Sequence, residues 1–287
     1  MPEGDEDAAL LVEALAGQGA LASWRVWTDA DVDWRSYELV VVRTPWDYTA
    51  RRAEFLSWTH RVPRLANPPD VLAWNSDKRY LGELAAAGVP IVPTTWSTPG
   101  AELALPDGPF VLKPSVGAGS KGAGRFDPTR PGVSDTARAH AAALHDAGRT
   151  VMVQPYLADV DEAGETALIY LAGRFSHAIG KSAMLAANLA NELDPGFSAS
   201  LFLEEHITVR LASAAELDLG DQVLRTVRAM VSHDLLYARV DLLPTPDGPV
   251  LIELELIEPS LFLSHGEQSA ERFAAAIIDA ATELTGR

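Results

Sequence analysis

The chain has 287 residues, of which 47% are apolar and 22% charged, values typical of a folded globular protein. Its 40 acidic and 23 basic residues give a net charge of −17, which disfavours nucleic acid as a partner because such a surface repels phosphate backbones. The absence of cysteine excludes disulfides, thiol nucleophiles and cysteine-ligated zinc. The apolar runs are far shorter than the roughly 20 residues that span a bilayer, so no membrane partner is expected.

The first 70 residues predict an open α/β lobe. A helix is expected over Asp7–Gly19, a short buried strand over Glu38–Val42 and a second helix over Arg51–Arg61, followed by a proline-rich loop. Residues 43–48 follow the strand, where open sheets usually carry functional loops. An α/β lobe normally begins with a strand, and the sequence leaves open whether a first strand is missing ahead of the first helix. The acidic opening of the chain does not resemble a secretory signal, and a cytoplasmic protein is expected.

The rest of the chain mixes helices with strands of antiparallel character. Helices are expected over Ser76–Ala87, Ala137–Ala147, Ala214–Ser232 and from about Gln268. Strands are expected over Phe110–Lys113, Val151–Val153, Thr166–Leu171, Arg174–Gly180, Tyr237–Leu243 and Pro249–Glu255. Turn residues separate the last two pairs of strands. We therefore expect α+β lobes around a cleft. A homodimer through the Ala-rich helices stays open, although no sequence feature indicates a specific interface.

Arg239-Val240-Asp241, followed one hairpin later by Glu253-Leu254-Glu255, is the strongest chemical pattern. Residues two apart on a strand face the same side, so pairing of these strands would bring three carboxylates and one guanidinium together. Three carboxylates repel one another unless a cation joins them, and Mg²⁺ prefers oxygen ligands. Taken alone, the pattern also fits a solvated strand face with one Arg–Glu pair.

A second pattern places Lys113 at the end of a strand and ahead of the glycine- and serine-rich residues 115–122. Small residues let backbone N–H groups approach phosphate oxygens, and lysine adds a positive charge. The order differs from a Walker loop, where the lysine follows the glycines, and no dinucleotide fingerprint is present. Taken alone, this segment also fits a flexible hairpin tip. Lys78, expected in the first turn of a helix, would alone be an ordinary surface lysine.

The order of these features resembles the ATP-grasp superfamily of carboxylate–amine ligases over about residues 67–259. The resemblance implies an N-terminal α/β substrate lobe over 1–70, a lid with the glycine-rich loop over 107–154, and a body with the metal site over 71–106 and 155–287. The two α+β lobes would clasp ATP, and ATP and Mg²⁺ are the implied cofactors.

The resemblance also implies roles for individual residues. Nucleotide contacts are expected from Lys78, Lys113, Ser115, Gly119, Ser120, Gln154, Pro155, Tyr156, Leu157 and, for the ribose, Asp161. Metal ligands are expected at Asp241, Glu253 and Glu255, and catalytic groups at Arg239, for an oxyanion, and Lys181, for phosphate. Most members carry asparagine where this chain has Glu255, so the extra charge is expected to change metal affinity or stoichiometry.

Residues 43–48 and 253–263 together resemble the corresponding motifs of one branch of this superfamily, the O-ureido-D-serine cyclo-ligases. The resemblance to this branch extends along nearly the whole chain. The candidate substrate contacts are Arg43, Trp46, Asp47, Glu165, Ser264 and His265, although such aromatic and imidazole side chains more often serve packing. The expected reaction activates a small carboxylate as an acyl phosphate and closes a ring within the same molecule. An intermolecular dipeptide-type ligase and a non-catalytic ATP-binding regulator stay open as alternatives.

Overall fold

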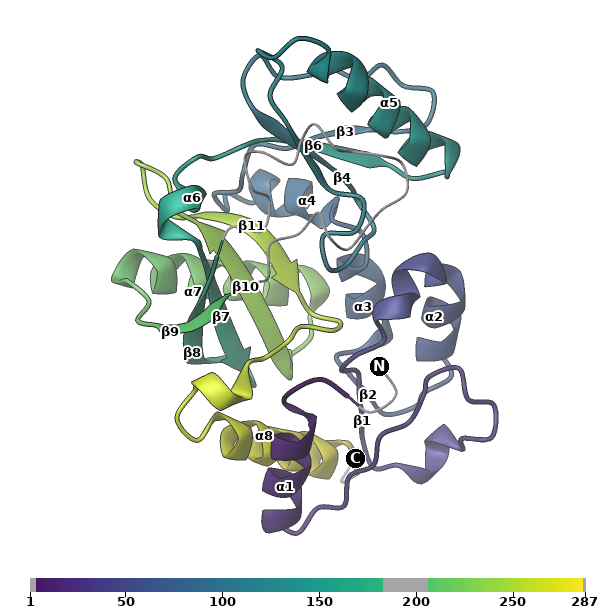
Figure 1. The fold of residues 1–287 in the computed structure, drawn as a ribbon. Helices are drawn as coiled ribbons and strands as arrows, with labels where there is room; N and C mark the ends of the chain where they lie inside the picture. Colours follow the sequence, from purple (N-terminus) through teal and green to yellow (C-terminus); the bar gives the residue numbers. More distant parts are fainter. Residues whose placement is uncertain (1–3, 183–205, 286–287) are drawn as a thin grey trace.

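The computed structural model describes residues 4–182 and 206–285, which form three lobes, each with its own β-sheet (Figure 1). The N-terminal lobe has a two-stranded parallel sheet, the lid a four-stranded antiparallel sheet and the body a five-stranded antiparallel sheet. The expected mixture of α/β and α+β lobes is confirmed. None of the helices in the described part of the chain is both long and apolar enough to cross a membrane.

The N-terminal lobe is held together by aromatic packing more than by its sheet. Its elements are α1 (Ala8–Gly17), η1 (Trp34–Ser36), β1 (Val40–Val41), η2 (Trp46–Ala50), α2 (Arg52–Thr59), β2 (Leu65–Ala66) and α3 (Pro69–Asn75). Trp27, Tyr48, Phe55 and Trp58 form one buried cluster with edge and tilted ring contacts. The strand expected over Glu38–Val42 is therefore only two residues long.

The lid is a sheet covered on one face by a helix. Its elements are β3 (Thr95–Ser97), β4 (Phe110–Pro114), β5 (Gly124–Phe126), α5 (Val133–Asp146) and β6 (Val151–Pro155), with the strand order β3-β6-β4-β5. Phe110 and Phe126 stack at a centroid distance of 5.6 Å in the core beneath α5. Because β3 pairs with β6 although it precedes residue 107, we place β3 with the lid; the division into lobes stays a proposal.

The body sheet is buried on both faces. Its elements are α6 (Val160–Ala163), β7 (Glu165–Leu171), β8 (Arg174–Lys181), β9 (Ile207–Arg210), α7 (Ala214–Val231), β10 (Tyr237–Leu243), β11 (Val250–Glu255), η4 (Leu263–His265) and α8 (Ser269–Thr285). Leu168 and Tyr170 belong to the cluster with α7, whereas Ala167 and Ile169 belong to the cluster with α8. Helix α1 packs against α8, so the start and the end of the chain meet (Figure 1).

The helix predicted over Ser76–Ala87 is wrong at its start. Ser76 is the C-cap of α3, and α4 (Tyr80–Ala86) begins only at Tyr80, so Lys78 lies in the turn between the two helices. The proline-rich loop expected here contains α3 because Pro69 occupies its first turn, where a missing N–H costs nothing. The turn matters because it presents Lys78 to the space between lid and body.

Candidate active site

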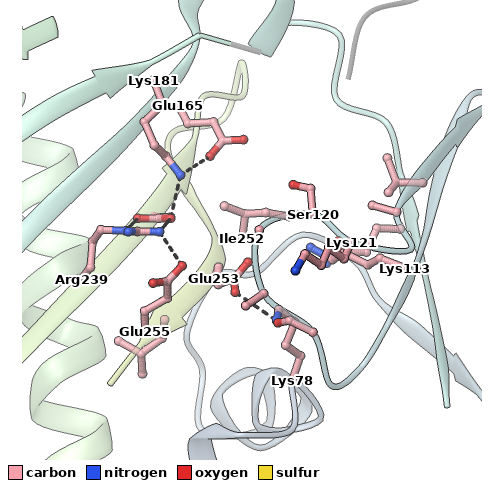
Figure 2. Close-up of a pocket in the computed structure, with 18 of the residues that line it drawn as sticks. Lys78, Lys113, Ser120, Lys121, Glu165, Lys181, Arg239, Ile252, Glu253 and Glu255 are labelled. Atoms are coloured by element: carbon pink, nitrogen blue, oxygen red, sulfur yellow. Dashed lines mark hydrogen bonds and ion pairs between the residues drawn. The ribbon is translucent and has the colours of Figure 1, made fainter. Parts of the chain in front are cut away.

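A cavity of about 440 Å³ is lined by strands and loops of both the lid and the body. All four lysines of the chain, Lys78, Lys113, Lys121 and Lys181, line it. Figure 2 shows Lys113 and Lys121 on one side of the cavity and Lys181 with Arg239 on the other. In a chain of net charge −17, this arrangement concentrates positive charge at one place.

The predicted convergence of charged side chains on β10 and β11 is confirmed. The two strands pair so that Arg239 lies opposite Glu255 and Asp241 opposite Glu253. Arg239 binds Asp241 through two hydrogen bonds, Nε to Oδ1 at 2.9 Å and Nη2 to Oδ2 at 3.0 Å, and also contacts Glu255. The Lys181 Nζ lies 2.8 Å from the same Asp241 carboxylate.

Burial and charge act in opposite directions on these carboxylates. Burial disfavours the ionised form of Asp241, but Arg239 and Lys181 outweigh it and lower the pKa of Asp241 to about 2. Burial raises the pKa of Glu255 to about 7, even though Arg239 contacts it, because Glu253 and Asp241 add negative charge nearby. Asp241 is therefore a fixed anion at neutral pH, whereas Glu255 titrates near neutrality.

Lys78 joins the body to the glycine-rich loop. Its ammonium lies 3.1 Å from Glu253 Oε1 and donates a hydrogen bond of 2.6 Å to the carbonyl of Gly117. The backbone N–H of Lys78 also donates to the carbonyl of Ser115 at 2.8 Å. Lys113 differs, because its ammonium forms no ion pair with any residue of the described chain, and burial lowers its pKa.

The chemistry of the acidic side chains suits a hard cation, but they do not form a ready-made metal site. Asp241, Glu253 and Glu255 supply oxygen donors, the type that Mg²⁺ prefers. Within residues 4–182 and 206–285, no three acidic, histidine or cysteine side chains converge on one point. The reason is that lysine and arginine already hold each carboxylate, so these residues fit a cation that arrives with other charges.

Most of the predicted nucleotide-contact residues line this cavity. Gly119, Ser120 and the segment 154–157 do so together with Lys78 and Lys113. Ser115 and Asp161 do not line it. Ser115 is buried at the base of the loop, with its N–H bonded to the carbonyl of Thr150 at 2.9 Å.

Asp161 supports the segment 154–157 from outside the cavity. It accepts a hydrogen bond from the hydroxyl of Tyr156 and lies 3.5 Å from Arg125 Nη1. The Arg125 guanidinium stacks on the Tyr156 ring at 3.4 Å from its centroid. These contacts hold the ring of Tyr156, which lines the cavity, in a fixed position.

The predicted substrate residues separate into two groups. Trp46 and Glu165 line the cavity, whereas Arg43, Asp47, Ser264 and His265 do not. Asp47 is exposed and accepts a hydrogen bond from an indole, and Ser264 contacts only its neighbour His265 among these residues. Direct substrate contact by these four residues is not supported by their positions.

Arg43 instead ties the N-terminal lobe to the body. Its guanidinium is buried, lies 3.2 Å from Asp5 Oδ2 and donates to the carbonyl of Pro259 at 3.0 Å. It also lies over the rings of Tyr237 and Phe273. The prediction that Arg43 binds substrate was based on its place after a strand, but the side chain points into this packed junction.

Sequence reasoning did not single out several cavity residues. Tyr48, Lys121, Ser260 and Glu258 line the cavity, but the sequence placed each of them only within a longer candidate segment. Lys121 could have been found by noting that the chain has only four lysines and that two flank the glycine-rich loop. Tyr48 carried no such signal, because its burial in an aromatic cluster is what a packing residue also shows.

Comparisons with known proteins decide the family. The profile described as "D-cycloserine synthetase DcsG, N-terminal domain" matches residues 1–67. The cycloserine biosynthesis protein DcsG of Streptomyces lavendulae is 37% identical over 96% of this chain and 94% of its own length. The chain belongs to the D-cycloserine synthetase family. A crystal structure of D-cycloserine synthetase DcsG matches with a TM-score of 0.83 and 35% identity, over 97% of this chain and 94% of that one.

A more distant structure supports the fold alone. The ATP-grasp ligase PsnB, in a complex with Mg, ADP and a variant of its minimal precursor, matches with a TM-score of 0.61 at 15% identity over 96% of each chain. This likeness and the family membership show an ATP-grasp fold. The protein is thus an ATP-dependent ligase, as the sequence predicted.

Proposed function

We propose that this ligase closes the ring of D-cycloserine from O-ureido-D-serine, using ATP to activate the carboxylate. The observation that supports it most is the collection of all four lysines around one cavity, opposite the Arg239–Asp241–Glu255 cluster. The substrate itself is suggested by the D-cycloserine synthetase DcsG, which this chain resembles over nearly its full length. Because the reaction uses ATP, we place it in the cytoplasm.

The lysines and the glycine-rich loop would hold the triphosphate. Lys113 is available because no described residue neutralises it, and Lys78 is fixed by the carbonyl of Gly117 within the loop. The segment 154–157 would receive the adenine through its backbone. Mg²⁺ would be held by Asp241, Glu253 and Glu255 and would supply charge compensation for the triphosphate.

The chemistry then needs two displacements. A substrate carboxylate oxygen attacks the γ-phosphorus, ADP leaves, and the acyl phosphate forms; Lys181 and Arg239 face the charge that develops. The nitrogen attached to the ether-type oxygen of the substrate attacks the acyl carbon, phosphate leaves, and the ring closes. Water then removes the carbamoyl group from that nitrogen as carbon dioxide and ammonia. A cavity closed by the lid keeps water from the acyl phosphate before the ring forms.

The decisive assay supplies Mg-ATP and O-ureido-D-serine as the sole acyl substrate. We expect ADP and a product with the mass of D-cycloserine, with no added amine. Lys113→Met provides a matched control that should lose most ADP release. ADP release that requires a second amino acid would instead support the dipeptide-type ligase, and ATP binding without turnover on either substrate would support the regulator.

A further inference from the structure

Five carboxylates line the cavity, and one of them differs from the rest. They are Glu165, Asp241, Glu253, Glu255 and Glu258. The first four each form an ion pair with a lysine or arginine that also lines the cavity (Figure 2). Glu258, which is only 8% exposed, forms no ion pair with any residue in the described ranges. A buried carboxylate without a cation is costly to keep unless a ligand supplies the missing charge.

Glu258 lines the cavity together with Tyr48, Lys78, Glu253 and Glu255, which all act on its carboxyl group. Tyr48, which is 4% exposed, lines the same cavity, and its hydroxyl acts to lower the pKa of Glu258. Trp46 Nε1 lies 3.4 Å from the backbone carbonyl of Glu258. Burial raises the pKa of Glu258 to about 8, which is what a carboxyl group lacking a cation shows.

The loop that carries Glu258 is fixed along its length. The carbonyls of residues 259 and 260 accept hydrogen bonds from Arg43 at 3.0 Å and from Arg239 at 3.3 Å. His177 Nε2 lies 3.0 and 3.1 Å from the carbonyls of residues 261 and 262. All four consecutive carbonyls are therefore held by side chains of the body or the N-terminal lobe. Such a supported loop is typical of a preorganised binding group rather than of a mobile rim.

The same contacts place opposite charges on one wall of the cavity. Arg239 binds the backbone only two residues beyond Glu258, so a guanidinium and an unpaired carboxylate lie on the same wall. An α-amino acid carries a carboxylate and an ammonium group on one carbon atom, and it would match this pair. A phosphate brings no positive charge that would stabilise the ionised form of Glu258, whereas an ammonium group does.

We propose that Glu258, with the hydroxyl of Tyr48, binds the α-ammonium group of an amino acid substrate and so orients its carboxylate toward Arg239. This assignment rests on the proposed function, because it concerns the substrate that the ligase activates. It makes Glu258 a specificity-determining residue that rejects simple carboxylic acids. An acid without the amino group would leave the buried carboxylate unpaired.

The test compares two ligands that differ only in this group. Isothermal titration, with a non-hydrolysable ATP analogue and Mg²⁺ present, measures the affinities for O-ureido-D-serine and for its analogue with hydrogen in place of the α-ammonium. The proteins are wild type, Glu258→Gln, Tyr48→Phe and, as a matched control, Glu283→Gln at the exposed end of α8.

We expect wild type and Glu283→Gln to prefer the ammonium-bearing ligand by about 10- to 100-fold. Glu258→Gln should lose this preference while binding the other ligand as wild type does, and Tyr48→Phe should weaken it. A preference retained in Glu258→Gln would overturn the proposal. So would an unchanged preference with a fall in kcat alone, because Glu258 would then act as a proton acceptor.

Failure of the proposed function is distinguishable from failure of this site. If wild type binds neither ligand and releases no ADP with them, O-ureido-D-serine is not the substrate. D-Alanine and propionate, tested in the same way on the same four proteins, then measure the ammonium preference of the cavity directly. Loss of that preference in Glu258→Gln supports the site, and its absence from wild type overturns it.

Discussion

The lysines around the cavity differ in whether a carboxylate pairs with them, and this difference affects how each can bind a phosphate. Lys78 and Lys181 are held by carboxylates at 3.1 and 2.8 Å. Lys113 has no such partner in the part of the chain that the structure describes, and burial lowers its pKa. A half-buried ammonium without an ion-pair partner costs free energy in the empty protein and regains it when a phosphate binds.

Substitution Lys113→Met should therefore weaken ATP binding without harming the fold. We expect the Kd of a non-hydrolysable ATP analogue to rise by about 10- to 100-fold, the usual range for a charged hydrogen bond. The melting temperature of the empty protein should stay equal or rise, because an unpaired charge is removed. Arg174→Met, at an exposed position outside the cavity, is the control. An unchanged Kd would remove Lys113 from the nucleotide site.

Substitution Arg239→Lys separates charge from geometry. Lysine keeps the positive charge beside Asp241 and Glu255, so the fold should survive, but it cannot reproduce the two-point contact with Asp241. We expect kcat to fall by about 100- to 1,000-fold, as for the loss of one oxyanion donor, with ATP affinity changed only a few-fold. Steady-state kinetics with titration of the ATP analogue gives both numbers. A kcat within threefold of wild type, which corresponds to a change of about 0.6 kcal/mol in the activation free energy, would contradict the assigned role.

At the residue scale, sequence reasoning succeeded where the rule was local. Two-residue spacing on a strand was enough to place Arg239 with Asp241 and Glu253 with Glu255 on one face. It failed for Arg43, whose partners Asp5 and the carbonyl of residue 259 lie 38 and 216 positions away in the chain. Nothing in the local pattern distinguishes such a long-range structural contact from a substrate contact.

At the scale of elements, the long helices and central strands were predicted and the short ones were not. Helix α7 begins with a capping box, in which Ser213 and Glu216 bond each other's backbone N–H, and it carries an apolar face. Strands β3, β5 and β9 have three or four residues each, too few for an alternation to be recognised. They form because neighbouring strands pair with them, which is a tertiary effect.

The close packing of α7 against the body sheet can be tested at Gly220. A Cβ added at Gly220 would meet the Tyr170 hydroxyl and lie 2.7 Å from Leu168 Cδ1. Gly220→Ala should lower the free energy of unfolding by about 1–3 kcal/mol through overpacking, although alanine favours helix. Gly17→Ala in α1, where nothing lies within 4 Å, should be neutral or stabilising by up to about 1 kcal/mol. Urea denaturation measures the free energy of unfolding of both variants. Equal effects would show that α7 does not pack closely against the sheet at Gly220.

On the scale of the whole molecule, the acidic chain concentrates its lysines at one cavity, and the cavity retains negative charge that burial makes costly. The overall fold followed from the order of motifs along the sequence. The closing of the chain by α1 against α8 did not, since that contact joins two amphipathic helices with no sequence mark of partnership. The side-chain contacts between the lobes likewise depend on the tertiary structure and have no local sequence signal.

The raised pKa values predict how stability depends on pH. Glu258, with a pKa of about 8, faces Tyr48, Lys78, Glu253 and Glu255, and burial is the main cause of its shift. The folded protein keeps a proton that the unfolded chain has already released above its ordinary pKa of 4.5. The contribution of Glu258 to stability is therefore greatest below that value and falls until the pH passes about 8, by about 1.4 kcal/mol per pH unit for one proton.

Melting temperatures of the empty protein across this pH range check the effect. Wild type should lose thermal stability as the pH rises, and Glu258→Gln should show a shallower slope because it cannot release the proton. Glu283→Gln should follow wild type. A Glu258→Gln slope equal to that of wild type would mean that the buried carboxyl does not govern this pH dependence.

The central claim is that ATP phosphorylates a carboxylate of the substrate, and a heavy-oxygen label tests it most directly. O-ureido-D-serine labelled in its carboxylate oxygens is turned over with unlabelled Mg-ATP, and the released inorganic phosphate is weighed by mass spectrometry. If an acyl phosphate forms and the nitrogen then displaces phosphate, each phosphate should carry one labelled oxygen from the substrate. Product formed with wholly unlabelled phosphate would contradict the account.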